Sequence, residues 1–331
     1  MILLAFALAA MAPKPLFASD ETIHISIRGP MTTLARNRSS DPRPATLTIG
    51  AETLPVSLSV RGITRRTVET CDFPPLRVEF TRPPSPTSPF AGQKKLKLVT
   101  HCRRNEGFQQ YLLLEYAAYR MYQQLSPLSF RVRLADVQYR QEDGRPYVER
   151  LAFFLEDTGD VARRNGLKEL HAPERIPVAS LSPRDAARYA LFQHMIGNHD
   201  WAMVAGPRGD DCCHNAKLIG AAGVAPGAVV PVPYDFDFSG LVDAPYATPP
   251  DALHLSDVRQ RVYRGYCAHK GDAAAVAAQM RTLRPQLLAA LTSTPGLEPR
   301  TVAKAEGYLD GFFMAVGSDS AVAALLKHCL R

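Results

Sequence analysis

The amino-acid sequence predicts an α+β fold in two lobes, with a β-rich first part and a mainly helical second part. The first part contains repeated runs in which apolar and polar residues alternate with period two, the pattern of half-buried strands. Residues 111–125 instead carry apolar residues at helical spacing. The chain of 331 residues is 46% hydrophobic and 21% charged, an ordinary globular composition that excludes a largely disordered chain.

The predicted strands of the first part are short, and a Pro-rich loop separates two of them. They cover residues 22–27, 45–49, 54–60, 76–80 and 96–99. Residues 50–52, Gly-Ala-Glu, form a hairpin connection between the second and third runs. Residues 83–89 must be a loop, because their prolines fix φ and remove backbone donors. Together these runs predict a small antiparallel sheet.

A long amphipathic helix over residues 111–125 follows, with Glu115 inside its apolar stretch. Three further strands are expected after this helix, at residues 130–134, 137–139 and 150–157. Ser182 followed by Pro183 is typical of a helix start, and this second helix is expected to end near Gly197.

The N-terminus has the features of an export signal. Residues 2–12 are an apolar run of suitable length, and Ala18 ends a suitable cleavage site, although the usual positive start is missing. The alternative is an N-terminal anchor or a buried strand. No later run approaches membrane-spanning length, so we expect a periplasmic or extracellular protein without a membrane span after cleavage. The predicted division is a signal peptide at 1–18, a β-rich lobe with one long helix at 19–156, and a helical lobe at 157–331 that carries the catalytic and metal segments.

Six cysteines form an even set that is compatible with three disulfides in an oxidising compartment. Cys71 and Cys102 each flank a predicted strand, so we expect them to pair, and Cys267 to pair with Cys212 or Cys213. The alternative is a zinc site, but adjacent Cys-Cys-His lacks the usual ligand spacing. The candidate zinc ligands would be His199, Asp200, Cys212, Cys213 and His214.

Chemistry-bearing side chains follow one another late in the chain as an acid, an amide and two acids. Asp200 follows His199, Asn215 follows His214, and Asp235 and Asp237 come two residues apart. Kinase-type phosphoryl transfer requires these groups in this order, because its catalysis depends mainly on positioning the reactants and neutralising their charge. The alternatives are an acidic turn for residues 235–238 and a capping or turn role for Asn215. No GxSxG, HExxH or Walker-type GxxxxGK[ST] segment supports a hydrolase or a P-loop protein.

With these segments the chain resembles the spore-coat protein H (CotH) kinase family, an atypical protein-kinase-like group. The resemblance covers most of the chain after the signal peptide. It is carried by Arg61-Gly62, the strand at 94–98 before a long helix, Phe154-Leu155-Glu156, Asn198-x-Asp200, His214-Asn215 and residues 233–237. It implies a two-lobed protein-kinase-like fold that binds ATP with Mg²⁺ or Mn²⁺. Asp200 would then orient or deprotonate the acceptor hydroxyl, and Asn215 and Asp235 would hold the metal, with Asp237 also within reach.

The same resemblance suggests which residues contact the nucleotide. Lys97 would steady its phosphates with Glu115 as its partner, and Glu156 would contact the base or ribose. Lys95 faces the same way as Lys97, and the whole run 94–97 is alternatively an exposed strand edge. Glu156 is alternatively a surface residue that ends a strand. His199 is a secondary candidate that would orient Asp200.

Two functions follow from these expectations. The first is a metal-dependent phosphotransferase that moves a nucleotide phosphoryl group to a hydroxyl of a protein or envelope acceptor. The second is a secreted pseudokinase, a binding or envelope-assembly protein without catalysis. Family members show RGNSS and then a lysine-rich strand, whereas this chain has Arg61-Gly62-Ile63-Thr64-Arg65-Arg66, and this departure favours the second. The net charge of +7 is scattered, and no nucleic-acid partner is expected.

Overall fold

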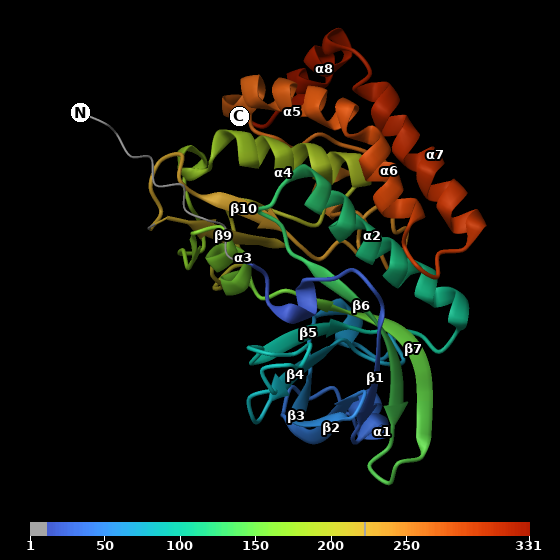
Figure 1. The fold of residues 1–331 in the computed structure, drawn as a ribbon. Coiled ribbons are helices and arrows are strands. Elements are labelled where there is room, and N and C mark those ends of the chain that lie inside the picture. The colour runs from blue at the N-terminus through green and yellow to red at the C-terminus, as the bar shows by residue number, and fades with distance from the viewer. Residues whose placement is uncertain (1–11, 222) are drawn as a thin grey trace.

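A closed barrel of seven strands forms the first part of the computed structural model, which describes residues 12–221 and 223–331 (Figure 1). The strands are β1 (Ile23–Arg28), β2 (Arg43–Ile49), β3 (Glu52–Val60), β4 (Leu76–Phe80), β5 (Lys95–Val99), β6 (Val132–Arg140) and β7 (Pro146–Leu155). They follow one another around the barrel in the order β1-β2-β3-β4-β5-β7-β6. Six neighbouring pairs are antiparallel, whereas β1 and β6 run parallel and close the ring.

The closed barrel shows that the predicted fold class is wrong. The expectation was a two-lobed protein-kinase-like fold whose first lobe held a small antiparallel sheet. The described residues instead form a closed mixed barrel together with eight α-helices. The error has a physical cause, because period-two alternation shows which side chains face inward but not which strands pair. Parallel pairing of β1 with β6 becomes possible because the intervening chain is long enough to return to the same end.

The interior of the barrel explains why the short predicted strands form. Alternate residues of β1 (Ile23, Ile25 and Ile27) are buried, and β4 alternates in the same way. Phe90, from the loop between β4 and β5, also lies in this core and packs edge-on against Phe154 at 5.5 Å between ring centroids. The expected loop at residues 83–89 is confirmed, since no helix or strand lies between Phe80 and Lys95 in this described stretch.

Helix α2 (Gln109–Leu125) connects β5 to β6 and lies between the barrel and the other large helices (Figure 1). Its apolar residues belong to the second hydrophobic core, which it shares with α4 (Pro183–Ile196). Helix α4 begins after Ser182 with a proline in its first turn and ends at Gly197, whose φ of 64° is left-handed. The sequence-based expectations for both helices are confirmed.

A second sheet of three strands lies beyond the barrel and was not predicted. It contains β8 (Lys168–Leu170), β9 (Ala216–Gly220) and β10 (Val230–Pro233) in the order β10-β9-β8. All pairs in this sheet are antiparallel. The hairpin of β9 and β10 matters for function, because it brings two of the candidate residues together.

The remaining elements are helices, and four of the six α-helices among them lie after residue 266. The α-helices are α1 (Met31–Arg36), α3 (Thr158–Arg164), α5 (Lys270–Thr282), α6 (Arg284–Thr292), α7 (Pro299–Ala315) and α8 (Asp319–Leu325). The short 3₁₀ helices are η1 (Pro15–Phe17), η2 (Thr64–Arg66), η3 (Glu106–Phe108), η4 (Val178–Ser180), η5 (Asp251–Leu253), η6 (Cys267–His269) and η7 (Leu326–His328). Among the described residues, no single helix is long and apolar enough to cross a membrane, although the bent pair 299–315 and 319–328 passes by length and composition.

Three disulfides join all six cysteines. The predicted Cys71–Cys102 pair is confirmed. The predicted partner of Cys267 is wrong, because Cys267 binds Cys329 while Cys212 and Cys213 bind each other. The cause lies at the C-terminus, where Leu330 pairs with the backbone around residue 266 and so places Cys329 beside Cys267. Three disulfides are compatible with an oxidising environment.

The expected signal peptide is only partly covered by the structure. Its apolar run up to residue 11 lies outside the described residues. Leu16 and Phe17 form part of η1 and are buried in the barrel core, and the backbone oxygen of Phe17 accepts a hydrogen bond from Arg131 at 3.0 Å.

Candidate functional site

A cavity of about 450 Å³ contains most of the residues that the sequence singled out. Its walls come from the turn at residues 61–65 after β3, the loop from residue 200 to 215, and the segment at 234–238 after β10. Asp200, Asn215, Asp235 and Asp237 all line this cavity. The structure therefore brings together the acid, the amide and the two later acids.

The hairpin of β9 and β10 explains why Asn215 and Asp235 lie close together. Pro233 pairs with Ala216, and one step further the backbone nitrogen of Tyr234 donates to the oxygen of Asn215 at 3.3 Å. Asn215 has a φ of 49° and Asp235 a φ of 65°, both in the left-handed region. Asn and Asp enter this region more readily than other residues that carry a Cβ. Local backbone chemistry therefore favours these two residue types at the ends of the two strands.

Asp200 is held in the cavity wall by the two residues that precede β9. His214 Nε2 lies 2.6 Å from Asp200 Oδ1, and the side-chain amide of Asn215 donates to Asp200 Oδ2 at 2.9 Å. The hydrogen bond to Asp200 raises the pKa of His214 above its usual value. Because the nitrogen of the Asn215 amide is used by Asp200, its oxygen is the atom that is left to bind a cation.

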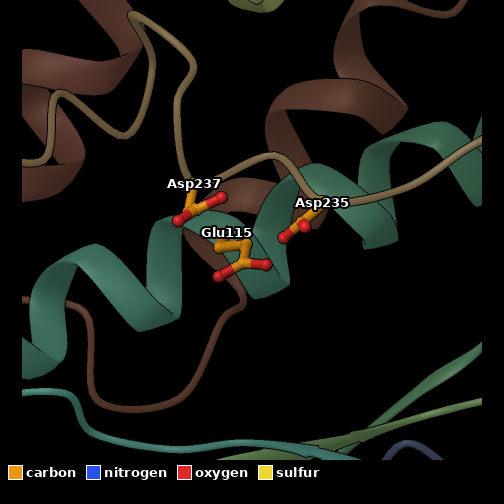
Figure 2. Close-up of side chains that lie close together, drawn as sticks. All are labelled: Glu115, Asp235 and Asp237. Carbon is orange, nitrogen blue, oxygen red and sulfur yellow. The ribbon is translucent and has the colours of Figure 1, made fainter. Parts of the chain in front are cut away.

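Asp235 and Asp237 form an acidic cluster with Glu115, and Figure 2 shows the three carboxylates pointing toward one another. Glu115 comes from α2, and the two aspartates come from the segment after β10 (Figure 2). Their closest oxygens all lie within 4.8 Å of one another. Phe236 anchors the segment by packing into the core against Tyr119, with 4.6 Å between ring centroids. The buried Phe of the alternative turn interpretation is thus present, and it positions both acids.

Arg65 lies in the middle of this acidic cluster. Its Nη1 is 2.8 Å from Glu115 Oε2, its Nη2 is 3.0 Å from Asp235 Oδ1, and its Nε is 3.1 Å from Asp237 Oδ2. Burial alone would lower the pKa of Arg65, but the carboxylates raise it well above its usual value. Burial raises the pKa of Glu115 and of Asp237. Burial also acts to raise the pKa of Asp235, but the nearby cations, Arg65 first, hold it below its usual value.

Lys97 does not form the ion pair with Glu115 that the sequence suggested, because Glu115 binds Arg65 instead. The Lys97 ammonium lies 4.8 Å from the centre of the Tyr234 ring, and Lys217 lies 5.5 Å from the same ring. Burial, together with the nearby positive charges of Arg61 and Lys217, lowers the pKa of Lys97 to about 7. Lys97, Lys217 and Lys95 line a second cavity of about 310 Å³. Lys97 therefore belongs to a cationic group beside Asp235.

The low pKa of Lys97 predicts unusual amine reactivity. An amine attacks an acylating reagent only in its neutral form, so labelling of Lys97 should rise with pH around a midpoint of about 7. The labelled peptide is followed by mass spectrometry, and the Lys97→Arg variant identifies its signal. A midpoint near the ordinary lysine value of about 10.4 would contradict the burial argument.

Glu156 lies at the end of β7 and lines the 310 Å³ cavity, but protein partners bind its carboxylate. Arg164 Nε donates to Oε1 at 3.0 Å, and the backbone nitrogen of Arg131 donates to Oε2 at 2.9 Å. Burial raises the pKa of Glu156 above its usual value. Glu156 is therefore not the surface residue of the alternative expectation, because its side chain is buried. Its carboxylate also already binds Arg164 and Arg131, which the expected contact with a base or ribose did not include.

Five residues of the site were not predicted from the sequence or have another role than predicted. His199 binds the backbone oxygen of Gln260 at 2.7 Å, and His214 is the histidine that contacts Asp200. Arg65 and Arg61 supply positive charge around Asp235, and Lys217 adds positive charge beside Lys97. The signal for Arg61 and Arg65 was the unusual basic turn at 61–66, whereas nothing in the local pattern distinguished Lys217.

Comparison with protein-family models and with curated proteins gives no match for this chain.

Proposed function

We propose that the chain is a metal-dependent phosphotransferase that moves a phosphoryl group from a nucleotide triphosphate to a hydroxyl acceptor. The observation that carries this proposal is the combination of charges in one site. Asn215 and Asp235 line the 450 Å³ cavity with Arg61, and Lys97 lies next to them over Tyr234. Carboxylate and amide oxygens suit Mg²⁺, and the cations suit the phosphate oxygens that such an ion shares.

In this proposal Asn215 and Asp235 hold the metal. The two residues offer short oxygen ligands from the two ends of one hairpin, and phosphate oxygens and waters would complete the coordination shell. The lowered pKa of Asp235 supports this role, because the carboxylate stays ionised at neutral pH. Both aspartates bind Arg65, but the side chain of Asp237 is only 7% exposed against 33% for Asp235, so we assign the metal to Asn215 and Asp235 rather than to Asp237.

Asp200 directs the acceptor hydroxyl in this proposal. Its carboxylate lines the same cavity and is fixed from two sides by His214 and Asn215. Because Asn215 also binds the metal in this proposal, its side-chain amide links Asp200 to the metal position. The resemblance of the segments around residues 200, 215 and 235 to the CotH kinase family points to the same chemistry. ATP with Mg²⁺ or Mn²⁺ is the donor that we propose.

A second candidate is a binding or envelope-assembly protein without catalysis. It is favoured by Arg65, which neutralises part of the acidic cluster, and by the missing pair of Lys97 with Glu115. For both candidates we propose export to the periplasm or the extracellular space, in keeping with the three disulfides. The expected signal peptide at residues 1–18 belongs to the same proposal.

Thermal unfolding with ATP and Mn²⁺ tests the proposed function. A ligand that binds only the folded state at 100 times its Kd adds about 2.7 kcal/mol of stability, so the midpoint of the wild-type chain should rise. Asp235→Asn should remove most of the Mn²⁺-dependent part of that rise, because one of the two metal ligands loses its charge. The exposed Asp251, in η5, offers a matched control as Asp251→Asn, which should behave as wild type. If ATP and Mn²⁺ do not change the midpoint of thermal unfolding of the wild-type chain, nucleotide binding is refuted.

A further inference from the structure

The acidic cluster of Glu115, Asp235 and Asp237 has the composition of a metal site, yet its centre holds a guanidinium. Each carboxylate accepts from a different nitrogen of Arg65, at 2.8, 3.0 and 3.1 Å, and the second oxygen of Glu115 also accepts from Nη2 at 3.4 Å. A divalent ion bound by the same oxygens would need them at about 2.0–2.6 Å from its own centre. The ion and the guanidinium would then occupy the same space, so the two exclude each other.

Burial and three ion pairs hold the side chain of Arg65 in this position. Its side chain is 9% exposed, and it belongs to η2, directly after the Arg61-Gly62 turn that lines the cavity. Three carboxylates face this one guanidinium. Asp235 differs from the other two acids, because it also lies among Arg61 and Lys97. Asp235 therefore belongs both to the acidic cluster and to the proposed metal position beside Asn215.

We infer that Arg65 is the resident cation of the acidic cluster, where it takes the place of one metal ion. As a positioning residue it fixes Asp235. It thereby limits this region to a single divalent ion, held by Asp235 and Asn215. The single ion rests on the proposed function, whereas the role of Arg65 in the cluster does not. Arg65 also ties the turn that carries Arg61 to the segment that carries Asp235. Phosphate-binding and metal-binding parts of the cavity are thereby held in one arrangement.

Counting of bound Mn²⁺ by its electron paramagnetic resonance signal tests this inference. Arg65→Met removes the guanidinium, so the chain should bind one more Mn²⁺ than the wild type, and its thermal midpoint should respond more strongly to Mn²⁺. Arg65→Lys keeps a cation in the cluster and should bind the wild-type number. Arg66→Met is the matched control, because Arg66 is the next residue and binds the backbone oxygen of Arg38 at 2.6 Å, away from the cluster. Equal Mn²⁺ numbers in Arg65→Met and wild type would overturn the inference.

A second arm does not depend on the folding of Arg65→Met. In the wild-type background, Asp237→Asn and Glu115→Gln should leave the Mn²⁺ affinity unchanged, because Arg65 keeps these acids from the metal. A loss of Mn²⁺ affinity in Asp237→Asn comparable to that in Asp235→Asn would overturn the inference. The two proposals can fail separately. If the wild type binds no Mn²⁺ through Asp235 but Arg65→Met gains one ion, the proposed function fails and the role of Arg65 stands.

Discussion

Asp200→Asn is expected to slow phosphoryl transfer about 10²–10⁴-fold, the usual contribution of a positioned general base. The amide has nearly the shape of the carboxylate and keeps an oxygen that can accept from His214 or Asn215. It cannot take the proton of an attacking hydroxyl. Transfer of labelled γ-phosphate from ATP to the chain or to water, with Mn²⁺ present, measures this rate. Binding of ATP and Mn²⁺ by thermal shift should persist, because Asp200 is not one of the proposed metal ligands.

Asp210→Asn is the matched control for this result. Asp210 lines the same cavity and is exposed, so its substitution removes the same negative charge from the same region. A general loss of negative potential would slow both variants alike, whereas a specific role of Asp200 slows only one. If Asp200→Asn transfers phosphate as fast as the wild type, Asp200 does not direct the acceptor.

Local patterns predicted the helices and strands of this chain better than their assembly. Alternation in β4 and helical spacing in α2 follow from which side chains are buried, and both are visible in a short window. Closure of the barrel depends on the parallel pairing of β1 with β6, whose partners lie more than a hundred residues apart. No window contains both strands. The same limitation explains Cys267, whose partner is chosen by the path of the C-terminus beside residue 266.

The candidate site was predictable where function requires particular residue types in order. Asp200, Asn215 and Asp235 were recognised from their sequence, and the register of β9 with β10 brings the last two together. The partner of Glu115 was not predictable. Arg65 and Lys97 both lie on the β-rich part before α2, and only the three-dimensional path of residues 61–66 brings Arg65 into the cluster.

Removal of the Cys267–Cys329 disulfide is expected to destabilise the C-terminal helices by about 4 kcal/mol, from the chain entropy of a loop of this length. The bridge spans 62 residues, from η6 to the end of η7, and encloses α5 to α8. Cys267→Ser/Cys329→Ser, compared with wild type in denaturant unfolding, measures the loss. The control is Cys212→Ser/Cys213→Ser, which removes the same chemical bond between neighbouring residues and so closes no long loop.

The same variant should also loosen the loop that carries Asp200, because the bridge anchors the segment before Cys267. Arg264 in that segment donates to the backbone oxygen of His199 at 2.6 Å and lies 4.6 Å from the centre of the Trp201 ring. When the C-terminus no longer holds residues 265–267, both contacts lose their support. Amide hydrogen exchange at residues 198–202 should then be faster in the variant than in the wild type, and it should increase more there than in the barrel strands. Exchange reports this because local opening depends on local stability. Equal protection of this loop in wild type and variant would show that the disulfide stabilises only the C-terminal helices.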